Sequence, residues 1–133
     1  VLQVVQATYA TMVSTATGTE QDTGLTATIT PQFTNSKILV LITQADCAKI
    51  DVIGPIVLRL YRDSTAIHTI ASQLLYQNGS SRFSVNCTGS FLDSPATVSA
   101  TTYKTTFSSS SGSTTRVQFG QTPSTIQLLE IAG

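Results

Sequence analysis

Short apolar segments separated by turn residues run along the whole chain, and no segment keeps the 3.6-residue period of an amphipathic helix. Leu25–Thr30 shows the pattern most clearly, because Leu, Ala and Ile alternate with Thr until Pro31 ends the segment. Short strands with regular turn signals are typical of sandwiches and barrels. We therefore predict an all-β fold, a jelly-roll-like antiparallel β-sandwich of about 8–10 strands. It should form a single domain over residues 1–133, which are enough to bury a core.

The expected strands are bounded by Gly, Pro, Asn, Asp and Ser, the residues that favour turns. They cover Val1–Tyr9, Leu25–Thr30, Lys37–Ala45, Pro55–Arg62, Ala66–Ala71, Arg82–Leu92, Thr97–Phe107, Thr115–Phe119 and Ser124–Ile131. The stretch between Tyr9 and Leu25 has room for one more short strand, and Asp46–Gly54 is expected to be a loop.

Two of these strands carry more detailed predictions. In Arg82–Leu92 the alternation points Phe83, Val85 and Cys87 toward the core. Within Thr97–Phe107 the apolar positions change parity, and a slip of one residue is what a β-bulge produces. We therefore predict a bulge in that strand.

Charged residues make up only 11% of the chain, against about 25% in a typical soluble domain. Hydroxyl groups take their place, since there are 23 Thr and 16 Ser. The net charge is +0, so the chain lacks the basic surface that neutralises nucleic-acid phosphates or binds anionic lipid. No apolar run is long enough to span a bilayer. We expect neither nucleic-acid binding nor membrane insertion.

Residues that perform catalysis are scarce. His68 is the sole histidine, so one chain cannot build a His-based metal site or catalytic pair. Asp46 and Asp51 bracket one expected loop, where a solvated loop is a better interpretation than a weak calcium site. Cys47 and Cys87 have no C-x-x-C spacing and could be free thiols or a disulfide. We predict a non-enzymatic protein with no catalytic residues, no cofactor and no metal.

Two central strands are apolar on both faces, whereas a sheet with one wet face should alternate. Ile38–Ile42 is apolar throughout, and Val57, Arg59 and Tyr61 form a second, partly apolar face of the next strand. Either loops or another subunit must cover such faces, and we favour subunits, because exposed apolar patches tend to mark contacts. Arg59 and Glu130 either reach water at an edge or form charge-assisted pairs at this contact.

Several segments, in order along nearly the whole chain, resemble the C-terminal domains of bacteriophage tail fibres and related virion appendages, particularly from phages of aquatic bacteria. They are Thr23–Pro31, Ser36–Val40, Leu60–Ile67, Leu92–Ala96, Thr102–Lys104, Ser124–Ile126 and Glu130–Ala132. The resemblance implies a β-sandwich that forms a homotrimer at the tip of a fibre and contacts the host surface. The chain would then be the C-terminal part of a longer fibre protein, located in the virion. It transfers no catalytic residues and no defined receptor site.

Strands that alternate in direction would bring the loops at 46–54, 72–81 and 108–113 to one end, opposite the N-terminus. There Tyr76 could stack on a sugar, while Asp51, Asn78 and Arg82 could bond its hydroxyls. The first hypothesis is therefore a trimeric tail-fibre tip that binds a host glycan or protein. The second is a capsid decoration, head-fibre or tail-adaptor protein that contacts only other virion proteins. The third is a secreted lectin or cytokine-like jelly roll.

Overall fold

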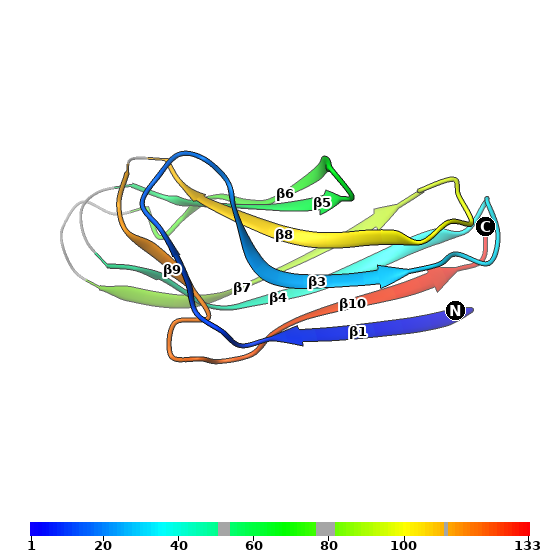
Figure 1. Cartoon of the computed structure of the whole chain (residues 1–133), viewed down its shortest axis with the longest axis horizontal. Helices are drawn as coiled ribbons and strands as arrows, with labels where there is room; N and C mark the ends of the chain where they lie inside the picture. Colours follow the sequence, from blue (N-terminus) through cyan, green and yellow to red (C-terminus); the bar gives the residue numbers. More distant parts are fainter. Residues whose placement is uncertain (51–53, 77–81, 111) are drawn as a thin grey trace.

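Two antiparallel β-sheets pack face to face in the computed structural model of the chain (Figure 1). The structure describes residues 1–50, 54–76, 82–110 and 112–133. Within these ranges there are ten strands and no helix. The predicted all-β sandwich is confirmed.

Sheet A has six strands, in the order β1-β10-β4-β9-β2, and β7 pairs with the other side of β4. Its strands are β1 (Gln3–Tyr9), β2 (Val13–Thr15), β4 (Lys37–Lys49), β7 (Phe83–Asp93), β9 (Thr115–Val117) and β10 (Ser124–Ile131). Sheet B has the order β3-β8-β5-β6. Its strands are β3 (Gln21–Ile29), β5 (Ile56–Arg62), β6 (Thr65–Leu74) and β8 (Thr101–Ser109).

The eight long strands form two groups of four, β1-β10-β4-β7 and β3-β8-β5-β6. The chain crosses between the sheets at β2–β3, β3–β4, β4–β5, β6–β7, β7–β8 and β8–β9, which is the winding of a jelly roll. The predicted jelly roll is therefore confirmed, and β2 is the extra strand expected between Tyr9 and Leu25. Both termini lie at one end of the sandwich (Figure 1).

The predicted start of the loop at Asp46 is wrong, because β4 continues to Lys49. The pairing of β4 with β7 shifts between Gln44 and Cys47, and Asp46 takes a left-handed φ of 42° there. The backbone NH of Asp46 donates to Oδ1 of Asn86 at 3.0 Å. An irregularity inside the strand thus replaces the expected strand end.

The bulge predicted in Thr97–Phe107 is also wrong. β8 begins only at Thr101 and pairs with β5 without any register shift, and the exposed Val98 belongs to the preceding connection. The irregularity lies in the partner strand β3 instead, between Asp22 and Thr26. There Gly24 has a φ of 91°, and a Cβ at this position would come within 2.1 Å of the Tyr9 ring.

The core between the sheets forms two apolar clusters, one toward the termini and one toward the opposite end. The first contains Leu25, Ala27, Ile29, Ile38, Val40, Ile42, Leu60, Tyr103, Ile126 and Leu128. The second contains Cys47, Ile56, Leu58, Phe107 and Val117. Between the two, along β4 and β8, lie the buried polar side chains of Gln44 and Thr105.

One expected core contribution is smaller than predicted. On β7, Cys87 packs against the second cluster, but Phe83 and Val85 remain exposed. Because β7 pairs only with β4, a side chain near its start has sheet neighbours on one side only. Phe83 and Val85 lie on the same side of β7 as Cys87, as predicted, since Val85 pairs with the buried Cys47, but the prediction that they join the core is wrong.

Cys47 and Cys87 are both free thiols, the first buried and the second half-buried. Burial, with smaller effects from Cys87 and Asp46, raises the pKa of Cys47 to about 12. Since the thiolate is the reactive form, iodoacetamide at pH 8 should alkylate Cys87 well before Cys47. Peptide mass spectrometry over a time course would check this order. Equal rates in the folded protein would contradict the burial of Cys47, and both thiols should react together in denaturant.

Candidate functional site

Two of the receptor-binding residues predicted from the sequence, Tyr76 and Arg82, are described and lie at one end of the sandwich. Asp51 and Asn78 lie outside the described residues. Tyr76 is 61% exposed, and Arg82 is exposed on the far side of the same connection. The pairings Ile56–Leu74 and Lys49–Phe83 place the neighbouring strand ends together, opposite the N-terminus (Figure 1). The described part of this end therefore offers the exposed aromatic rings of Tyr76 and Phe83 and the guanidinium group of Arg82.

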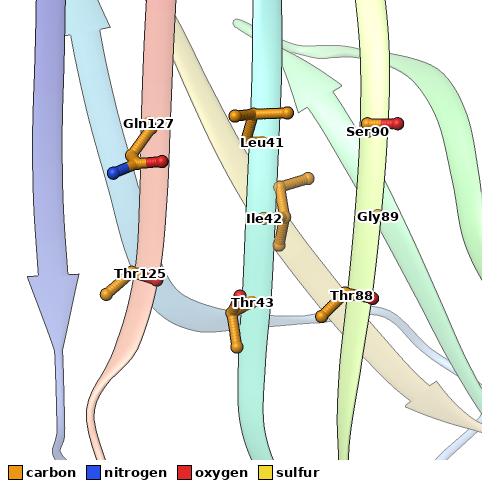
Figure 2. Close-up of a pocket in the computed structure, with 8 residues that line it drawn as sticks. All are labelled: Leu41, Ile42, Thr43, Thr88, Gly89, Ser90, Thr125 and Gln127. Carbon is orange, nitrogen blue, oxygen red and sulfur yellow. The ribbon is translucent and has the colours of Figure 1, made fainter.

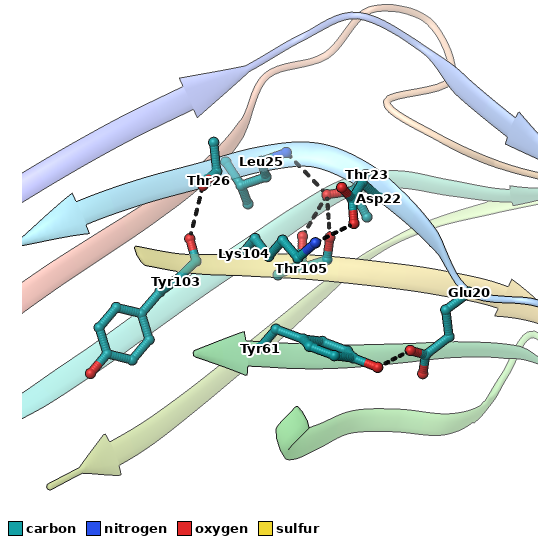
Figure 3. Close-up of polar contacts among 9 residues, drawn as sticks. All are labelled: Glu20, Asp22, Thr23, Leu25, Thr26, Tyr61, Tyr103, Lys104 and Thr105. Atoms are coloured by element: carbon teal, nitrogen blue, oxygen red, sulfur yellow. Dashed lines mark hydrogen bonds and ion pairs between the residues drawn. The ribbon is translucent and has the colours of Figure 1, made fainter. Parts of the chain in front are cut away.

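The predicted subunit face on sheet B contains Val57, Arg59 and Tyr61, which share the outer side of β5. Glu20, just before β3, accepts a hydrogen bond from the Arg59 guanidinium. It also accepts one from the Tyr61 hydroxyl (Figure 3). The hydrogen bond to Glu20 raises the pKa of Tyr61 above its ordinary value. The carboxylate partner of Arg59 therefore comes from its own chain.

A second ion pair lies on the same face of sheet B. Nζ of Lys104 is 2.9 Å from Oδ1 of Asp22 and 5.7 Å from the centre of the Tyr61 ring (Figure 3). Together with Arg59 and Glu20, these groups make the outer face of sheet B a charged surface whose ions are paired within the chain. Nothing in this arrangement requires a partner to neutralise it.

Glu130 does not fit the predicted role at a subunit contact, because its side chain is fully buried within its own chain. Nε2 of Gln3 donates to Oε2 at 2.6 Å, and the backbone NH of Gln32 donates to Oε1 at 2.7 Å. Burial alone would raise the pKa of Glu130, but hydrogen bonds from Ser36, Gln3 and the backbone of Gln32 and Phe33 outweigh it and lower the pKa. Glu130 therefore links β10 to the β3–β4 turn through the hydrogen bond from the backbone NH of Gln32.

The outer face of sheet A carries an aliphatic row that crosses four strands. Val4 of β1 pairs with Leu129 of β10, Leu129 pairs with Leu39 of β4, and Leu39 pairs with Leu92 of β7. Val4 is 58% exposed and Leu92 is 50% exposed. The apolar character of β4 on both faces was visible in the sequence. The other three members were not, because only the strand register shows that they stand beside Leu39.

Next to the aliphatic row the same face is hollowed. The groove holds about 560 Å³ and lies across β10, β4 and β7 (Figure 2). Its lining residues are Leu41, Ile42, Thr43, Thr88, Gly89, Ser90, Thr125 and Gln127. Six of these lining residues belong to two further cross-strand rows, one of Gln6, Gln127, Leu41 and Ser90, and one of Thr8, Thr125, Thr43 and Thr88. No charged side chain belongs to these three described rows.

The described ranges contain no helix that is long and apolar enough to cross a membrane. Within the same ranges no group of three or more His, Cys, Asp and Glu side chains is placed to hold a metal ion. Two surfaces described above are the candidate sites, the exposed end near Tyr76 and the outer face of sheet A.

Comparison with known proteins finds solved structures with a similar fold but no matching protein family. No protein-family model matches the chain, and no curated protein matches its sequence. VP2 in the subviral particle of infectious bursal disease virus matches with a TM-score of 0.58 and 14% identity, over 96% of this chain and 32% of VP2. A structure of the Gx strain of that virus matches with a TM-score of 0.49 and 16% identity, over 96% of this chain and 33% of the other.

The insecticidal delta-endotoxin Cry8Ea1 from Bacillus thuringiensis matches with a TM-score of 0.42 and 15% identity, over 91% of this chain and 20% of the toxin. The chain thus spans about a third or less of the length of these proteins. At such identities the likeness to VP2 shows the fold alone, a jelly-roll sandwich.

Proposed function

We propose that this chain is a non-enzymatic structural protein of a virion. The observation that carries the proposal is the aliphatic row on the outer face of sheet A, together with the two uncharged cross-strand rows beside it, on a jelly-roll domain. A surface of this kind suits protein assembly, since it can be covered without removing charges from water. The fold likeness to VP2, a protein that forms a subviral particle, supports the same class of role.

More specifically, the chain serves as the homotrimeric tip of a tail fibre or another external appendage that binds the host surface. The ordered sequence resemblance to tail-fibre tips supports this assignment. The geometry is also suitable, because a shaft joined at the N-terminus would point the end with Tyr76 and Arg82 away from the particle (Figure 1). An exposed tyrosine ring and a guanidinium group suit a glycan or a protein receptor.

A second role, as a capsid decoration, head-fibre or tail-adaptor protein, is favoured by one observation. VP2, whose fold this chain resembles, was solved in a subviral particle, which is a particle and not an appendage. In that role the contacts would be made only with other virion proteins.

Immunogold electron microscopy separates these roles. Antibodies raised against the folded domain should label particles of the virus that encodes this chain at the ends of their appendages. Label spread over the capsid would establish the decoration role and exclude the fibre tip. Particles without any label would overturn the virion proposal.

Incubation with host polysaccharide should leave its chain length unchanged, and shortened chains would refute the non-enzymatic assignment.

A further inference from the structure

We propose that copies of this chain pack on one another through the outer face of sheet A, which includes Leu39 of the doubly apolar segment Ile38–Ile42, and not through the outer face of sheet B with Val57, Arg59 and Tyr61. The inference rests on the homo-oligomer in the proposed function and names the contacting surface. The occupant is a second copy of the same chain. Three features of the face support this choice: its exposed aliphatic row, the absence of charged side chains from its three central described rows, and the hollow beside the aliphatic row. The exposed Lys37 lies at the edge of these rows, next to Leu39 on β4.

The aliphatic row leaves large apolar side chains in water. Val4 and Leu92 stand at its two ends and are at least half exposed, while Leu39 and Leu129 between them are half-buried. Leu2 extends the same side of β1, since its backbone NH donates to the Glu130 carbonyl at 2.8 Å and continues the ladder. Contiguous apolar surface of this kind is uncommon on a free monomer and is removed from water by contact with a protein.

Charge distinguishes the two sheets as surfaces for self-contact. The three cross-strand rows of sheet A contain only aliphatic, amide and hydroxyl side chains, so an identical copy brings no like charge against them. Sheet B presents Arg59 and Lys104 together with Glu20 and Asp22, and all four are already paired within the chain. Covering that face would cost the hydration of two ion pairs and gain no new partner.

The relief of the sheet A face also suits an identical copy. The aliphatic row consists of large side chains that are partly or mostly exposed. The adjoining groove is hollow on its β7 side because Ser90, which pairs with Leu41, has a small side chain (Figure 2). One copy therefore offers both an exposed aliphatic row and a hollow that can receive one, as self-association requires.

The area of the face indicates what kind of association to expect. Four strands about 4.8 Å apart and about seven residues long cover roughly 450 Å² of sheet. Two copies in full contact would bury roughly 900 Å² in total, which is near the ~1,000 Å² that marks a specific interface. We therefore expect association that depends on protein concentration and is sensitive to single substitutions in the aliphatic row.

Sedimentation velocity over a dilution series tests the inference. The wild-type chain should shift from an assembled form to a monomer on dilution. Val4→Asp and Leu92→Asp should each weaken this association at least tenfold, because each places a charge in the contact. Ser90→Trp should weaken it as well by filling the hollow without adding a charge. Thr69→Asp on the exposed β6 strand of sheet B is the matched control and should associate like the wild type.

The possible outcomes distinguish a wrong contact face from a wrong oligomeric state. Circular dichroism should show that all four variants remain folded, since these positions are on the surface. If Thr69→Asp dissociates the assembly and the sheet A variants do not, the face is wrong while the oligomer stands. A wild-type chain that stays monomeric at the highest concentration overturns both the contact and the homo-oligomer. The virion assignment would still be decided separately by immunogold labelling.

Discussion

Replacing Gln44 by Ala should lower the free energy of unfolding by about 4 kcal/mol, since it removes a buried side chain and its hydrogen bonds together. Gln44 is fully buried on β4, between the two apolar clusters. Its Nε2 donates to Oε1 of Gln118 and, at 3.0 Å, to Oγ of Ser124. Its Oε1 accepts a hydrogen bond from Oγ1 of Thr105 at 2.8 Å.

The hydrogen bonds of Gln44 belong to a larger network that joins the two sheets. Nε2 of Gln118 donates to the carbonyl oxygen of Thr23 at 2.9 Å, and Oγ of Ser124 donates to Oε1 of Gln118 at 2.8 Å. Oγ1 of Thr23 and Oγ1 of Thr105 are 2.5 Å apart. A buried network is stabilising only while its members are satisfied, so loss of the central amide affects several partners at once.

One further variant separates the loss of hydrogen bonds from the loss of side-chain volume, and another serves as a control. Gln44→Leu keeps most of the volume and removes only the polar contacts, so it should cost about 2 kcal/mol. Gln73→Ala, at an exposed position of β6, is the matched control and should change stability by less than about 0.5 kcal/mol. Urea denaturation monitored by circular dichroism would measure all three. A Gln44→Ala protein as stable as the control would show that the network contributes nothing.

The strands were largely predictable because their apolar periodicity and turn residues are local signals. The bounds of β4 were not, since Asp46 reads as a turn residue and is kept in the strand by the side chain of Asn86, 40 positions away. For a similar reason Gln44 carries no signal in the sequence. Its hydrogen-bond partners come from β8, β10 and the residue after β9, and only the folded topology brings them together.

For the outer faces of the two sheets, the sequence indicated which side chains are apolar or charged but not which residues lie next to them. Arg59 was expected either to reach water at an edge or to pair with a charge at a subunit contact, and its partner is Glu20 of its own chain, 39 positions away. Leu39 was rightly identified as apolar on an outer face. That Val4 and Leu92 stand beside it depends on strand register, which a single sequence does not state. The face now proposed for self-contact therefore emerges only from the fold.

Replacing Asp93 by Ala should lower the free energy of unfolding by about 3 kcal/mol, because the substitution leaves a buried hydroxyl and a partly buried guanidinium without their acceptor. Nη1 of Arg62 lies 2.8 Å from Oδ1 and 2.9 Å from Oδ2 of Asp93. The hydroxyl of the fully buried Tyr103 donates to Oδ2 at 2.7 Å. The three side chains join β7, β5 and β8 at the end of the sandwich that holds the termini.

Asp22→Ala is the matched control, because it removes a carboxylate from the exposed ion pair with Lys104. Exposed pairs contribute about 0.2–1 kcal/mol, so this variant should stay close to the wild type. Chemical denaturation at pH 7 would compare the two. Equal losses for Asp22→Ala and Asp93→Ala would contradict a special role for the buried carboxylate.

The same cluster predicts how stability changes at alkaline pH. Burial, and secondarily the hydrogen bond to Asp93, raises the pKa of Tyr103 above its ordinary value of 10.0. Above about pH 10 the unfolded chain releases this proton while the folded chain keeps it, so the folded state binds more protons and stability falls as pH rises. Below pH 10 the contribution of the neutral phenol is fully present. Denaturation of wild type and Tyr103→Phe at several pH values would isolate it.

Tyr103→Phe should cost about 1 kcal/mol at pH 7 through the lost hydrogen bond. Above pH 10 its disadvantage should shrink by up to about 1.4 kcal/mol per pH unit, because phenylalanine has no proton to release. Other groups that titrate in this range, such as Cys47, are present in both proteins and cancel in the difference. A stability difference that stays constant between pH 8 and pH 11 would mean that the Tyr103 hydroxyl ionises freely in the folded protein.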